Sequence, residues 1–322
     1  MRAITASDGK LTLTDQPVPE PTNKELLIRV EAAALNRTDL AMRDGKSGYK
    51  TNPILGIEVA GVVEKADEQR TFAVGDRVMG LVNGGGYAEY AVMPSNRAMR
   101  IPTGFSFEEG AAIPEVFLTA YQTLFWHGRL AERESVLIHA GASGVGTAAI
   151  QLATQLRQAK VIVTAGSEEK LDVCHSLGAD VTVNYKTQAF EDEVLKATNN
   201  EGVNVLLDFI GASYWDKNLK SIGTEGRWVL IGVLGGPHVD NVNLFKLMAK
   251  YVQLTGTLLT PRSDDYKTRL TADFAATALP LFKSKKIRPM VDTTFSLEDA
   301  SLAHEHMEAN RNIGKIILTL DS

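Results

Sequence analysis

Six apolar segments rich in β-branched residues constrain this chain more than any other feature of its sequence. They are SVLIHA (135–140), KVIVTA (160–165), DVTVNY (180–185), VNVLLDFI (203–210), RWVLIGVL (227–234) and QLTGTLL (253–259), and each connection between them is long enough for a helix. Strands that are apolar on both faces and alternate with helices are typical of a parallel sheet covered on each side. The sequence therefore predicts a doubly wound α/β domain of the Rossmann type in the second half of the chain.

The turn after the first of these segments reads HAGASGVGTAAIQLA (139–153) and leads into a helix. Gly141 permits a tight turn, Gly144 lets a pyrophosphate approach the backbone, and Gly146 lets the helix lie close to the strand. Amide groups at the start of such a helix face the phosphates, although this motif has Ser143 where a G-x-G-x-x-G pattern has its middle glycine. The expected dinucleotide contacts are Gly141, Ser143, Gly144, Val145 and Gly146.

The end of the second segment, AGSEEK (165–170), indicates which dinucleotide binds. An NAD site places an Asp or Glu about 20 residues after the last glycine, where this chain has the small, uncharged Ala165. The space beside Gly166 then suits a 2′-phosphate, to which Ser167 can donate a hydrogen bond and Lys170 can supply charge. Tyr185 ends the third segment and can close over the same phosphate. These residues favour NADP(H).

The same residues allow a second interpretation. Ser167 is also a typical helix N-cap, Lys170 a typical solvated helix residue, and Glu168 and Glu169 could serve NAD. A carboxylate within ~5 Å of the phosphate would cost on the order of 3 kcal/mol per unit charge at an effective dielectric near 20. The NADP(H) interpretation therefore requires both glutamates to point outward from the helix.

The length of 322 residues favours two domains, and the pattern of short strands and turns over residues 1–114 predicts a compact, mostly β first domain. The net charge of -5 gives no reason to expect nucleic acid or an anionic membrane as a partner. The N-terminus has no apolar core of a signal peptide, and no apolar run reaches the roughly 18 residues of a spanning helix. A cytoplasmic location is the resulting expectation. Cys174, the single cysteine, excludes a disulfide framework.

Motifs along almost the whole chain resemble those of the medium-chain dehydrogenase/reductases, and within them the zinc-free quinone oxidoreductases related to zeta-crystallin. The motifs are ALNRTDL (34–40), LGIEVAG (55–61), VGDRV (74–78), AAIPEVFLTAY (111–121), HAGASGVGTAAIQLA (139–153), DFIGASYW (208–215), GRWVLIG (226–232) and MEANRNIGKIIL (307–318). AAIPE, the IG and SYW of DFIGASYW, and MEANRNIGK look most like the branch of tumour-suppressor-inducible quinone oxidoreductases.

This resemblance implies two domains and a cofactor. It implies a catalytic domain built on a chaperonin-10-like β-barrel, made of residues 1–117 and closed by residues 287–322. It places an NADPH-binding Rossmann domain over residues 118–286, with NADPH as the hydride donor. The pattern of the last part of the chain predicts helices over residues 266–282 and 297–309 and a final strand over residues 315–320.

The zinc-dependent relatives need metal ligands that this chain lacks. They have a Cys where this chain has Asn36 and a His where it has Ile57, and their structural zinc needs four thiolates. Cys174 is the single thiol, and His304 and His306 are two residues apart on an expected helix, so they do not share a face. We therefore expect no metal. Quinones and activated enones accept hydride readily without a Lewis acid, whereas alcohol dehydrogenation needs one.

The resemblance also implies roles for three individual residues. Asn36 lies beside the nicotinamide, where its amide binds the cofactor or orients a substrate oxygen, unless it only stabilises a turn. Tyr49 matches a tyrosine of the substrate pocket, and an ordinary loop tyrosine is the alternative. Thr119 matches the residue at the nicotinamide ribose, and a helix threonine bonded to its own backbone is the alternative. The sequence shows no nucleophilic triad, so we expect catalysis by positioning, with a proton from water or Tyr49.

Loops and the last strand supply the remaining expected cofactor contacts. The loops that follow the fourth and fifth segments, including residues 234–236, lie where open α/β sheets bind ligands. Residues 258–260 resemble the family segment whose backbone meets the carboxamide, and the NRNIGK motif matches a C-terminal cofactor contact, with a surface turn as the alternative. The residues concerned are Gly211, Gly232, Leu234, Leu258, Leu259, Asn312 and Lys315.

The segment QLTGTLL predicts an apolar strand at the edge of the sheet, which soluble proteins usually cover. Related quinone oxidoreductases pair this strand, so we expect a homodimer, unless the following helix shields the edge. The function expected from all of these observations is NADPH-dependent reduction of quinones. An NADPH-dependent enone or enoyl reductase and a non-catalytic NADPH-binding redox sensor are the alternatives.

Overall fold

The computed structural model describes residues 1–46 and 52–320, and the contacts within the chain divide it into two compact units. Unit 1 contains Met1–Leu118 and Leu259–Ser322, and unit 2 contains Thr119–Leu258. Residues 259–286 therefore group with unit 1, although the sequence assigns them to the cofactor domain. The reason is helix α9 (Asp264–Lys283), whose Phe282 packs edge-on against Phe105 and Phe117 of unit 1.

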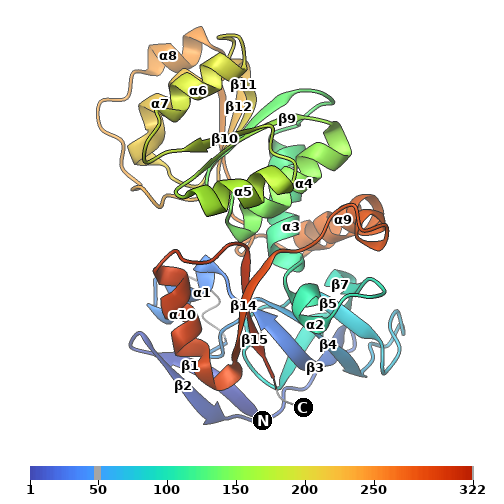
Figure 1. Cartoon of the computed structure of the whole chain (residues 1–322). Coiled ribbons are helices and arrows are strands. Elements are labelled where there is room, and N and C mark those ends of the chain that lie inside the picture. Colours follow the sequence, from blue (N-terminus) through green and yellow to red (C-terminus); the bar gives the residue numbers. More distant parts are fainter. Residues whose placement is uncertain (47–51, 321–322) are drawn as a thin grey trace. The chain divides into compact units, whose positions relative to one another are not determined.

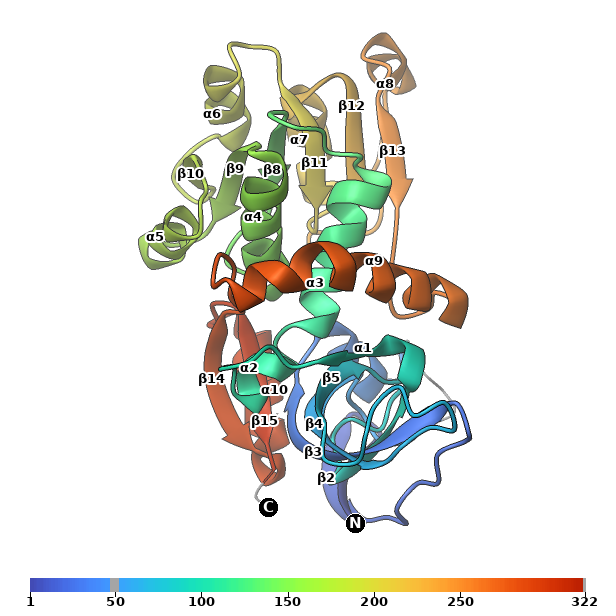
Figure 2. The same cartoon turned by 90° about the vertical axis from the view of Figure 1, so that its right-hand side faces the viewer.

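Unit 2 is built on a parallel sheet of six strands in the order β10-β9-β8-β11-β12-β13. The strands are β8 (Ser135–Ile138), β9 (Lys160–Ala165), β10 (Val181–Asn184), β11 (Val203–Asp208), β12 (Ile222–Leu230) and β13 (Gln253–Gly256). The chain runs outward from β8 to β10 and then returns to β11 on the other side of β8, which is the order of a dinucleotide-binding fold. The predicted doubly wound sheet is confirmed, and Figure 2 shows β13 beside β12 at its edge.

Helices cover both faces of this sheet. α4 (Gly144–Arg157) and α5 (Glu168–Ser176) lie on one side of it, and α6 (Phe190–Ala197) and α7 (Trp215–Ser221) lie on the other (Figure 1). Side chains of the strands form a buried core that includes Leu137, Ile162, Val183, Leu206 and Trp228. The other helical elements that begin or lie in unit 2 are η2 (Gln122–His127), which is π-helical, η3 (Ala212–Tyr214) and the short α8 (Leu244–Ala249).

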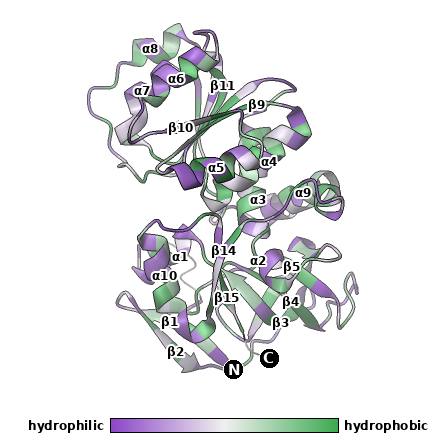
Figure 3. Cartoon of the chain, viewed as in Figure 1, coloured by the Kyte–Doolittle hydropathy of each residue, from purple (hydrophilic) through white to green (hydrophobic). Residues whose placement is uncertain are grey.

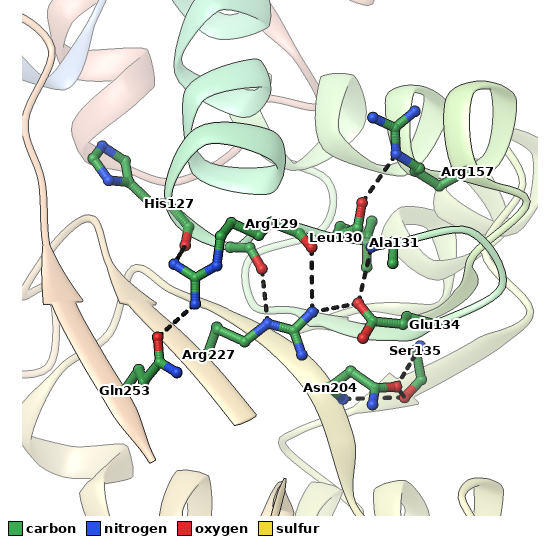
Figure 4. Close-up of polar contacts among 11 residues, drawn as sticks. His127, Arg129, Leu130, Ala131, Glu134, Ser135, Arg157, Asn204, Arg227 and Gln253 are labelled. Atoms are coloured by element: carbon green, nitrogen blue, oxygen red, sulfur yellow. Dashed lines mark hydrogen bonds and ion pairs between the residues drawn. The ribbon is translucent and has the colours of Figure 1, made fainter. Parts of the chain in front are cut away.

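Polar side chains join the strands of unit 2 at their amino ends (Figure 4). Arg227 pairs with Glu134, and its Nε donates a hydrogen bond to the carbonyl oxygen of Gly128 at 2.9 Å. Asn204 Oδ1 accepts from both the backbone N–H and the hydroxyl of Ser135, each at 2.9 Å, and so links β11 to β8. The Arg227 and Glu134 side chains remain 13% and 24% exposed, so this network lies close to solvent.

Unit 1 contains a mixed sheet in the order β14-β15-β3-β4-β5-β7, with β6 also paired to β3, and a separate hairpin of β1 and β2. Its strands are β1 (Arg2–Ser7), β2 (Lys10–Asp15), β3 (Glu25–Ala34), β4 (Glu58–Lys65), β5 (Arg77–Leu81), β6 (Tyr90–Pro94), β7 (Ala98–Arg100), β14 (Val291–Ser296) and β15 (Lys315–Thr319). Its helical elements besides α9 are α1 (Arg37–Arg43), η1 (Ser95–Arg97), α2 (Phe107–Ala111), η4 (Leu297–Asp299) and α10 (Ala300–Glu308), and α3 (Pro114–Tyr121) begins in it.

The C-terminal segment completes the sheet of unit 1. β15 pairs with β3 in antiparallel fashion, and Ile317 lies opposite Ala34. The sequence pattern predicts β15 and α10 but misses β14, which pairs in parallel with β15. β14 escapes prediction because its residues, VDTTFS, are all half-buried or exposed and show no apolar alternation.

Burial follows hydropathy in both units. Strands of both sheets are mostly hydrophobic in Figure 3, whereas the outer helices α5 and α10 also carry hydrophilic residues. The longest helix, α9, contains charged residues throughout its first half. Within residues 1–46 and 52–320, no helix combines the length and the apolar character that crossing a bilayer requires.

Candidate active site

Two glycines of the turn after β8 make contacts that leave no space for a side chain. A Cβ at Gly146 would lie 2.4 Å from the carbonyl oxygen of Ala140. A Cβ at Gly141 would lie 2.9 Å from Cβ of Val163 and 3.1 Å from Sγ of the buried Cys174. Backbone and packed strand atoms do not give way easily, so a side chain at Gly146 in particular would push the turn apart.

Ser143 takes the place of the middle glycine of the motif and caps helix α4. Its Oγ accepts a hydrogen bond from the N–H of Gly146 at 3.1 Å. The N–H of Thr147 bonds back to the carbonyl oxygen of Ser143, so the N–H groups of Gly144 and Val145 have no acceptor within the helix. N–H groups in this position, together with the helix dipole, suit a phosphate group.

The carboxyl ends of β9 and β10 bring the predicted 2′-phosphate residues together. A Cβ at Gly166 would lie 2.7 Å from the Tyr185 hydroxyl and 3.1 Å from Cε of Lys186, so both side chains cover this glycine. Ser167 is the N-cap of α5, and its Oγ accepts from the N–H of Lys170 at 3.4 Å. A capping hydroxyl uses its lone pair and keeps its own proton, so Ser167 can still donate to a ligand. The sequence reasoning missed Lys186, although it directly follows Tyr185.

Glu168 does not point outward as the NADP(H) interpretation expects. Its Oε1 accepts a hydrogen bond from Nδ2 of Asn184 at 3.0 Å, so the carboxylate folds back toward the end of β10. Asn184 is almost buried and also accepts the N–H of Lys186 on its Oδ1 at 3.2 Å. The expectation is therefore wrong for Glu168, because the amide of Asn184 gives its carboxylate a partner near the strand ends. Glu169 is exposed.

In unit 1, a buried cluster of charged and polar side chains fixes the amide of Asn36. Nδ2 of Asn36 donates to Oε1 of Glu58 at 2.8 Å and to the carbonyl oxygen of Ala34 at 3.3 Å. Oδ1 of Asn36 accepts from Nζ of Lys315 at 2.7 Å, and Lys315 also pairs with Glu58 at 2.7 Å. Asn36, Glu58 and Lys315 are 6%, 0% and 4% exposed. The sequence reasoning missed Glu58, whose partners are far away along the chain.

A chain of buried titratable groups lies beside Asn36. Oδ2 of Asp39 accepts the N–H of Asn36 at 2.8 Å and the Tyr87 hydroxyl at 3.1 Å, and that hydroxyl lies 3.4 Å from Nε2 of His304. Among the described residues, Oδ1 of Asp39 and Nδ1 of His304 have no hydrogen-bond partner. Burial raises the pKa of Asp39 to about 7 and lowers the pKa of His304 to about 4, because it disfavours both charged forms. Asp39 therefore changes its protonation state near neutral pH.

Comparison with known proteins identifies the family of this chain. Residues 22–103 match the alcohol dehydrogenase GroES-like domain, and residues 144–276 match the zinc-binding dehydrogenase domain. The chain is 31% identical to the quinone oxidoreductase of Lama guanicoe over 333 residues, which cover 99% of this chain and 98% of that protein. It belongs to the zeta-crystallin-like quinone oxidoreductases. These are oxidoreductases of the medium-chain dehydrogenase/reductase superfamily, as the motifs predict, and the fold class is confirmed as well.

Further relatives and solved structures are similar to this chain over almost its whole length. The mouse synaptic vesicle membrane protein VAT-1 homolog-like is 32% identical and is matched over 100% of this chain and 82% of its own length. The Escherichia coli quinone oxidoreductase complexed with NADPH has a TM-score of 0.88 at 26% identity, covering 99% of this chain and 100% of that one. An NAD-dependent alcohol dehydrogenase has a TM-score of 0.89 at 32% identity and full coverage of both chains.

In this quinone oxidoreductase family member, the loops after β11 and β12 are tied to a single residue. Asp208 accepts the N–H of Gly211 on its Oδ1 at 3.0 Å and the N–H of Gly232 on its backbone oxygen at 3.3 Å. Gly211 has a φ of 79°, which favours glycine. Leu234, in the second loop, is exposed. The sequence reasoning missed Asp208, although it ends an otherwise apolar segment.

The structure places the other predicted residues in less distinctive surroundings. Thr119 is buried on α3, and its carbonyl oxygen accepts from the Thr123 hydroxyl at 2.8 Å. Nδ2 of Asn312 donates to the carbonyl oxygen of Gly314 at 2.8 Å, which is the local bond of a turn. Leu258 is exposed and Leu259 is buried. Tyr49 lies outside the described residues.

The two positions that the sequence comparison with zinc-dependent dehydrogenases singles out, 36 and 57, carry other chemistry in this chain. Ile57 is buried and has no ligand atom, and the amide of Asn36 is already bonded to Glu58 and Lys315. Within the described part of the chain, no three His, Cys, Asp or Glu side chains are grouped so that they could hold a metal ion. These residues do not fit the zinc that the name of the matched dehydrogenase domain implies.

Proposed function

We propose that this chain is an NADPH-dependent oxidoreductase that reduces quinones by hydride transfer without zinc. The observation that carries the proposal is the pair of positions 36 and 57, where a fixed amide and an aliphatic side chain stand in place of metal ligands. Acceptors that need no Lewis acid, such as quinones, fit such a site. The similarity over the full length to proteins named quinone oxidoreductase supports this choice.

Unit 2 contains groups that fit NADPH, which supplies a hydride when bound. The turn after β8 offers N–H groups and close backbone approach to the pyrophosphate, through Gly141, Ser143, Gly144, Val145 and Gly146. Gly166, Ser167, Lys170 and Tyr185 are the residues that we propose for the 2′-phosphate, and we add Lys186, whose side chain covers Gly166 together with that of Tyr185. The NADPH complex of the E. coli enzyme supports this choice, whereas the similarity to an NAD-dependent dehydrogenase makes NADH the necessary comparison.

The bonding of Asn36 supports one of its two expected roles. Both hydrogens of its amide are used, one by Glu58 and one by the carbonyl oxygen of Ala34. Its Oδ1 accepts from Lys315 and keeps one further lone pair. We infer that Asn36 is left with the role of a hydrogen-bond acceptor toward a ligand, because neither of its amide hydrogens is available to orient a substrate oxygen. The proton of the reaction comes from water or from Tyr49.

The test is NADPH oxidation by the purified protein with ortho-quinones, para-quinones and enones as acceptors, with NADH as the alternative donor. We expect quinone turnover with at least a tenfold preference for NADPH, about 1.4 kcal/mol, and no loss of activity with a chelator. Faster turnover of enones would favour the enone reductase, and tight NADPH binding without turnover would favour the sensor. Stoichiometric zinc with chelator-sensitive activity would refute the zinc-free mechanism.

We also propose that the protein forms a homodimer through the edge of the unit 2 sheet. β13 is the edge strand, and Leu254 on it is 42% exposed. Phe245 and Met248 on α8, the helix that precedes β13, are 71% and 68% exposed, so apolar side chains are exposed on both elements. Such a surface on a sheet edge is suited to a second copy of the chain.

Light scattering at micromolar concentration tests the dimer. We expect twice the mass of the chain for the wild type and the monomer mass for Leu254→Lys, because the charge would be buried between the two edges. A monomeric wild type would refute the pairing.

A cytoplasmic location and a small-molecule substrate, with neither nucleic acid nor membrane as partner, remain predictions from the sequence.

A further inference from the structure

A buried hydrogen-bond relay lies at the carboxyl ends of β8 and β11. The order of the sheet reverses between these two strands, and open α/β sheets bind their ligands at such a point. His139 directly follows β8 and Asp208 ends β11, and the N–H of His139 donates to the carbonyl oxygen of Leu207 at 3.2 Å. The relay therefore lies where a dinucleotide meets this sheet.

The relay runs through four buried side chains: Thr164, His139, Asn218 and Asp208. Oγ1 of Thr164 lies 2.9 Å from Nδ1 of His139, and Nε2 of His139 lies 2.7 Å from Oδ1 of Asn218. Nδ2 of Asn218 donates to Oδ2 of Asp208 at 3.0 Å, and Nε1 of Trp228 donates to the same oxygen at 3.0 Å. The four residues come from β9, β8, α7 and β11, so the relay joins separate elements of unit 2.

Donor and acceptor chemistry gives the relay a single direction. Asn218 directs its NH2 group to Asp208, so its oxygen is the atom that faces His139 and it accepts there. Nε2 of His139 then carries a proton, and Nδ1 accepts from the Thr164 hydroxyl. Burial lowers the pKa of His139, which keeps the imidazole in this neutral form. Each member of the relay thus determines the role of the next.

Both ends of the relay hold glycine turns. Oδ1 of Asp208 accepts the N–H groups of Ile210 at 2.8 Å and Gly211 at 3.0 Å, and its backbone oxygen accepts the N–H of Gly232. At the other end, the carbonyl oxygen of Thr164 accepts the N–H of Gly141 at 2.9 Å. The side chain of Asp208 therefore holds the turn at Gly211, and the backbone oxygens of Asp208 and Thr164 hold Gly232 and Gly141 beside the relay.

We propose that His139, Asn218 and Asp208 are positioning residues for dinucleotide binding, because the relay orients the Asp208 carboxylate that holds the turn at Gly211 and braces the strand ends that carry the bonds to Gly141 and Gly232. They act through the backbone groups that they hold, and a change in the relay is expected to alter affinity for the dinucleotide. The inference rests on the proposed function in taking NADPH as the ligand.

Asn218→Asp is the sharpest test, because it keeps the shape of the side chain and removes the NH2 donor. At pH 8 the new carboxylate faces Asp208, the two charges repel, and we expect the NADPH dissociation constant to rise about tenfold or more. At pH 5.5 the two carboxyl groups can share a proton, which restores a donor, so we expect a value within about threefold of the wild type at that pH. His139 and Tyr214 are the titratable neighbours of this pair, and Tyr185, Glu191 and Lys217 lie beyond them.

Asn204→Asp is the matched control on the same strand, β11. Asn204 lies at the amino end, and its Oδ1 acts as acceptor for Ser135, a role that a carboxylate keeps. We expect its NADPH dissociation constant to match the wild type at both pH values. Thr164→Val is the second relay variant, since it removes one hydroxyl at nearly constant volume, and we expect a rise of about threefold at pH 8.

Binding of NADPH is measured by calorimetry at a temperature well below thermal unfolding of each variant, so that a purely structural loss is separated from a loss of affinity. A wild type that does not bind NADPH would contradict the proposed function. A wild type that binds NADPH, together with an Asn218→Asp protein that behaves like Asn204→Asp or loses affinity equally at both pH values, would overturn the relay. If Asn218→Asp does not fold, an unchanged affinity in Thr164→Val would overturn it.

Discussion

In the unit 2 sheet, the side where the strands begin (the amino edge) and the side where they end (the carboxyl edge) are held by different kinds of contact. At the amino edge, Arg227, Glu134 and Asn204 form contacts close to solvent (Figure 4). At the carboxyl edge, glycine turns that exclude side chains are held by a buried relay with Asp208 at its end. Contacts near solvent can be lost one at a time because water replaces them, whereas a buried relay leaves an unpaired group when any member changes. We therefore expect substitutions at the amino edge to lower only the free energy of unfolding. Substitutions at the carboxyl edge are expected to weaken ligand binding as well.

The largest effect is expected from Gly146→Ala at the carboxyl edge. A Cβ there would lie 2.4 Å from the carbonyl oxygen of Ala140, so helix α4 has to move away from the turn. We expect the NADPH dissociation constant to rise about 100-fold and the free energy of unfolding to fall by about 3 kcal/mol. Fluorescence titration and urea unfolding measure the two quantities. Gly256→Ala in β13 is the control, since a Cβ there meets nothing within 4 Å, and equal losses in both variants would contradict the comparison.

A smaller loss of stability is expected when the pH is lowered. Because burial lowers the pKa of His139 below its ordinary value of 6.5, the folded protein keeps this imidazole neutral while the unfolded chain takes up a proton. The contribution of His139 is therefore present above pH 6.5 and is lost as the pH falls below it, by at most about 2 kcal/mol at pH 5. Urea unfolding of the wild type and His139→Gln between pH 8 and pH 5 measures it, and the variant is expected to lose less stability than the wild type. If the free energies of unfolding of the two proteins changed in parallel with pH, His139 would not titrate differently in the folded and unfolded states.

The next effect concerns the preference for NADPH over NADH. Lys170→Glu places a negative charge near the proposed 2′-phosphate, and we expect the preference for NADPH over NADH to fall about tenfold, or about 1.4 kcal/mol. Lys186→Glu is expected to act in the same direction, because Lys186 covers Gly166. Lys160→Glu, at the amino end of β9, is the control with the same change of charge and is expected to leave the preference unchanged. A similar loss in all three variants would indicate a general charge effect instead of a site.

The smallest effect is expected at the amino edge. Arg227→Met removes the pair with Glu134 and the hydrogen bond to Gly128, and we expect a loss of about 1 kcal/mol, or about 3 °C in melting temperature. The NADPH dissociation constant is expected to stay within about twofold of the wild type. Calorimetry provides both numbers, and a tenfold change in affinity would break the distinction between the two edges.

The sequence predicts the parts of the molecule that depend on local patterns. Apolar segments such as KVIVTA predict strands because burial on both faces of a parallel sheet demands such runs. Gly146 is predicted correctly as a close-contact position because a glycine turn between strand and helix is a local signal, whereas the close contact of Gly141 with Val163 and Cys174 is not predicted. The replacement of a zinc ligand by Ile57 is also visible from the motif in which it stands.

The parts that the sequence does not predict depend on partners far apart in the chain. Glu58 and Lys315 are 257 residues apart, as their numbers show, and no local pattern indicates that they share Asn36. The hydrogen bond from Asn184 to Glu168 likewise joins the ends of two strands, and it overturns the expectation that Glu168 points outward. β14 is missed because it gains its partner only when β15 lies beside it.

The pairing of β15 with β3 has a consequence for the order in which the protein matures during synthesis. Unit 2 is one continuous stretch of chain, so it can fold while the ribosome is still adding residues. Unit 1 has no such opportunity, because β3 emerges early and then waits for residues 315–319. Until Lys315 arrives, the carboxylate of Glu58 lacks the cation that it pairs with in the finished protein. A nascent chain that stops short of Lys315 would therefore carry a folded unit 2 and a unit 1 whose sheet is incomplete.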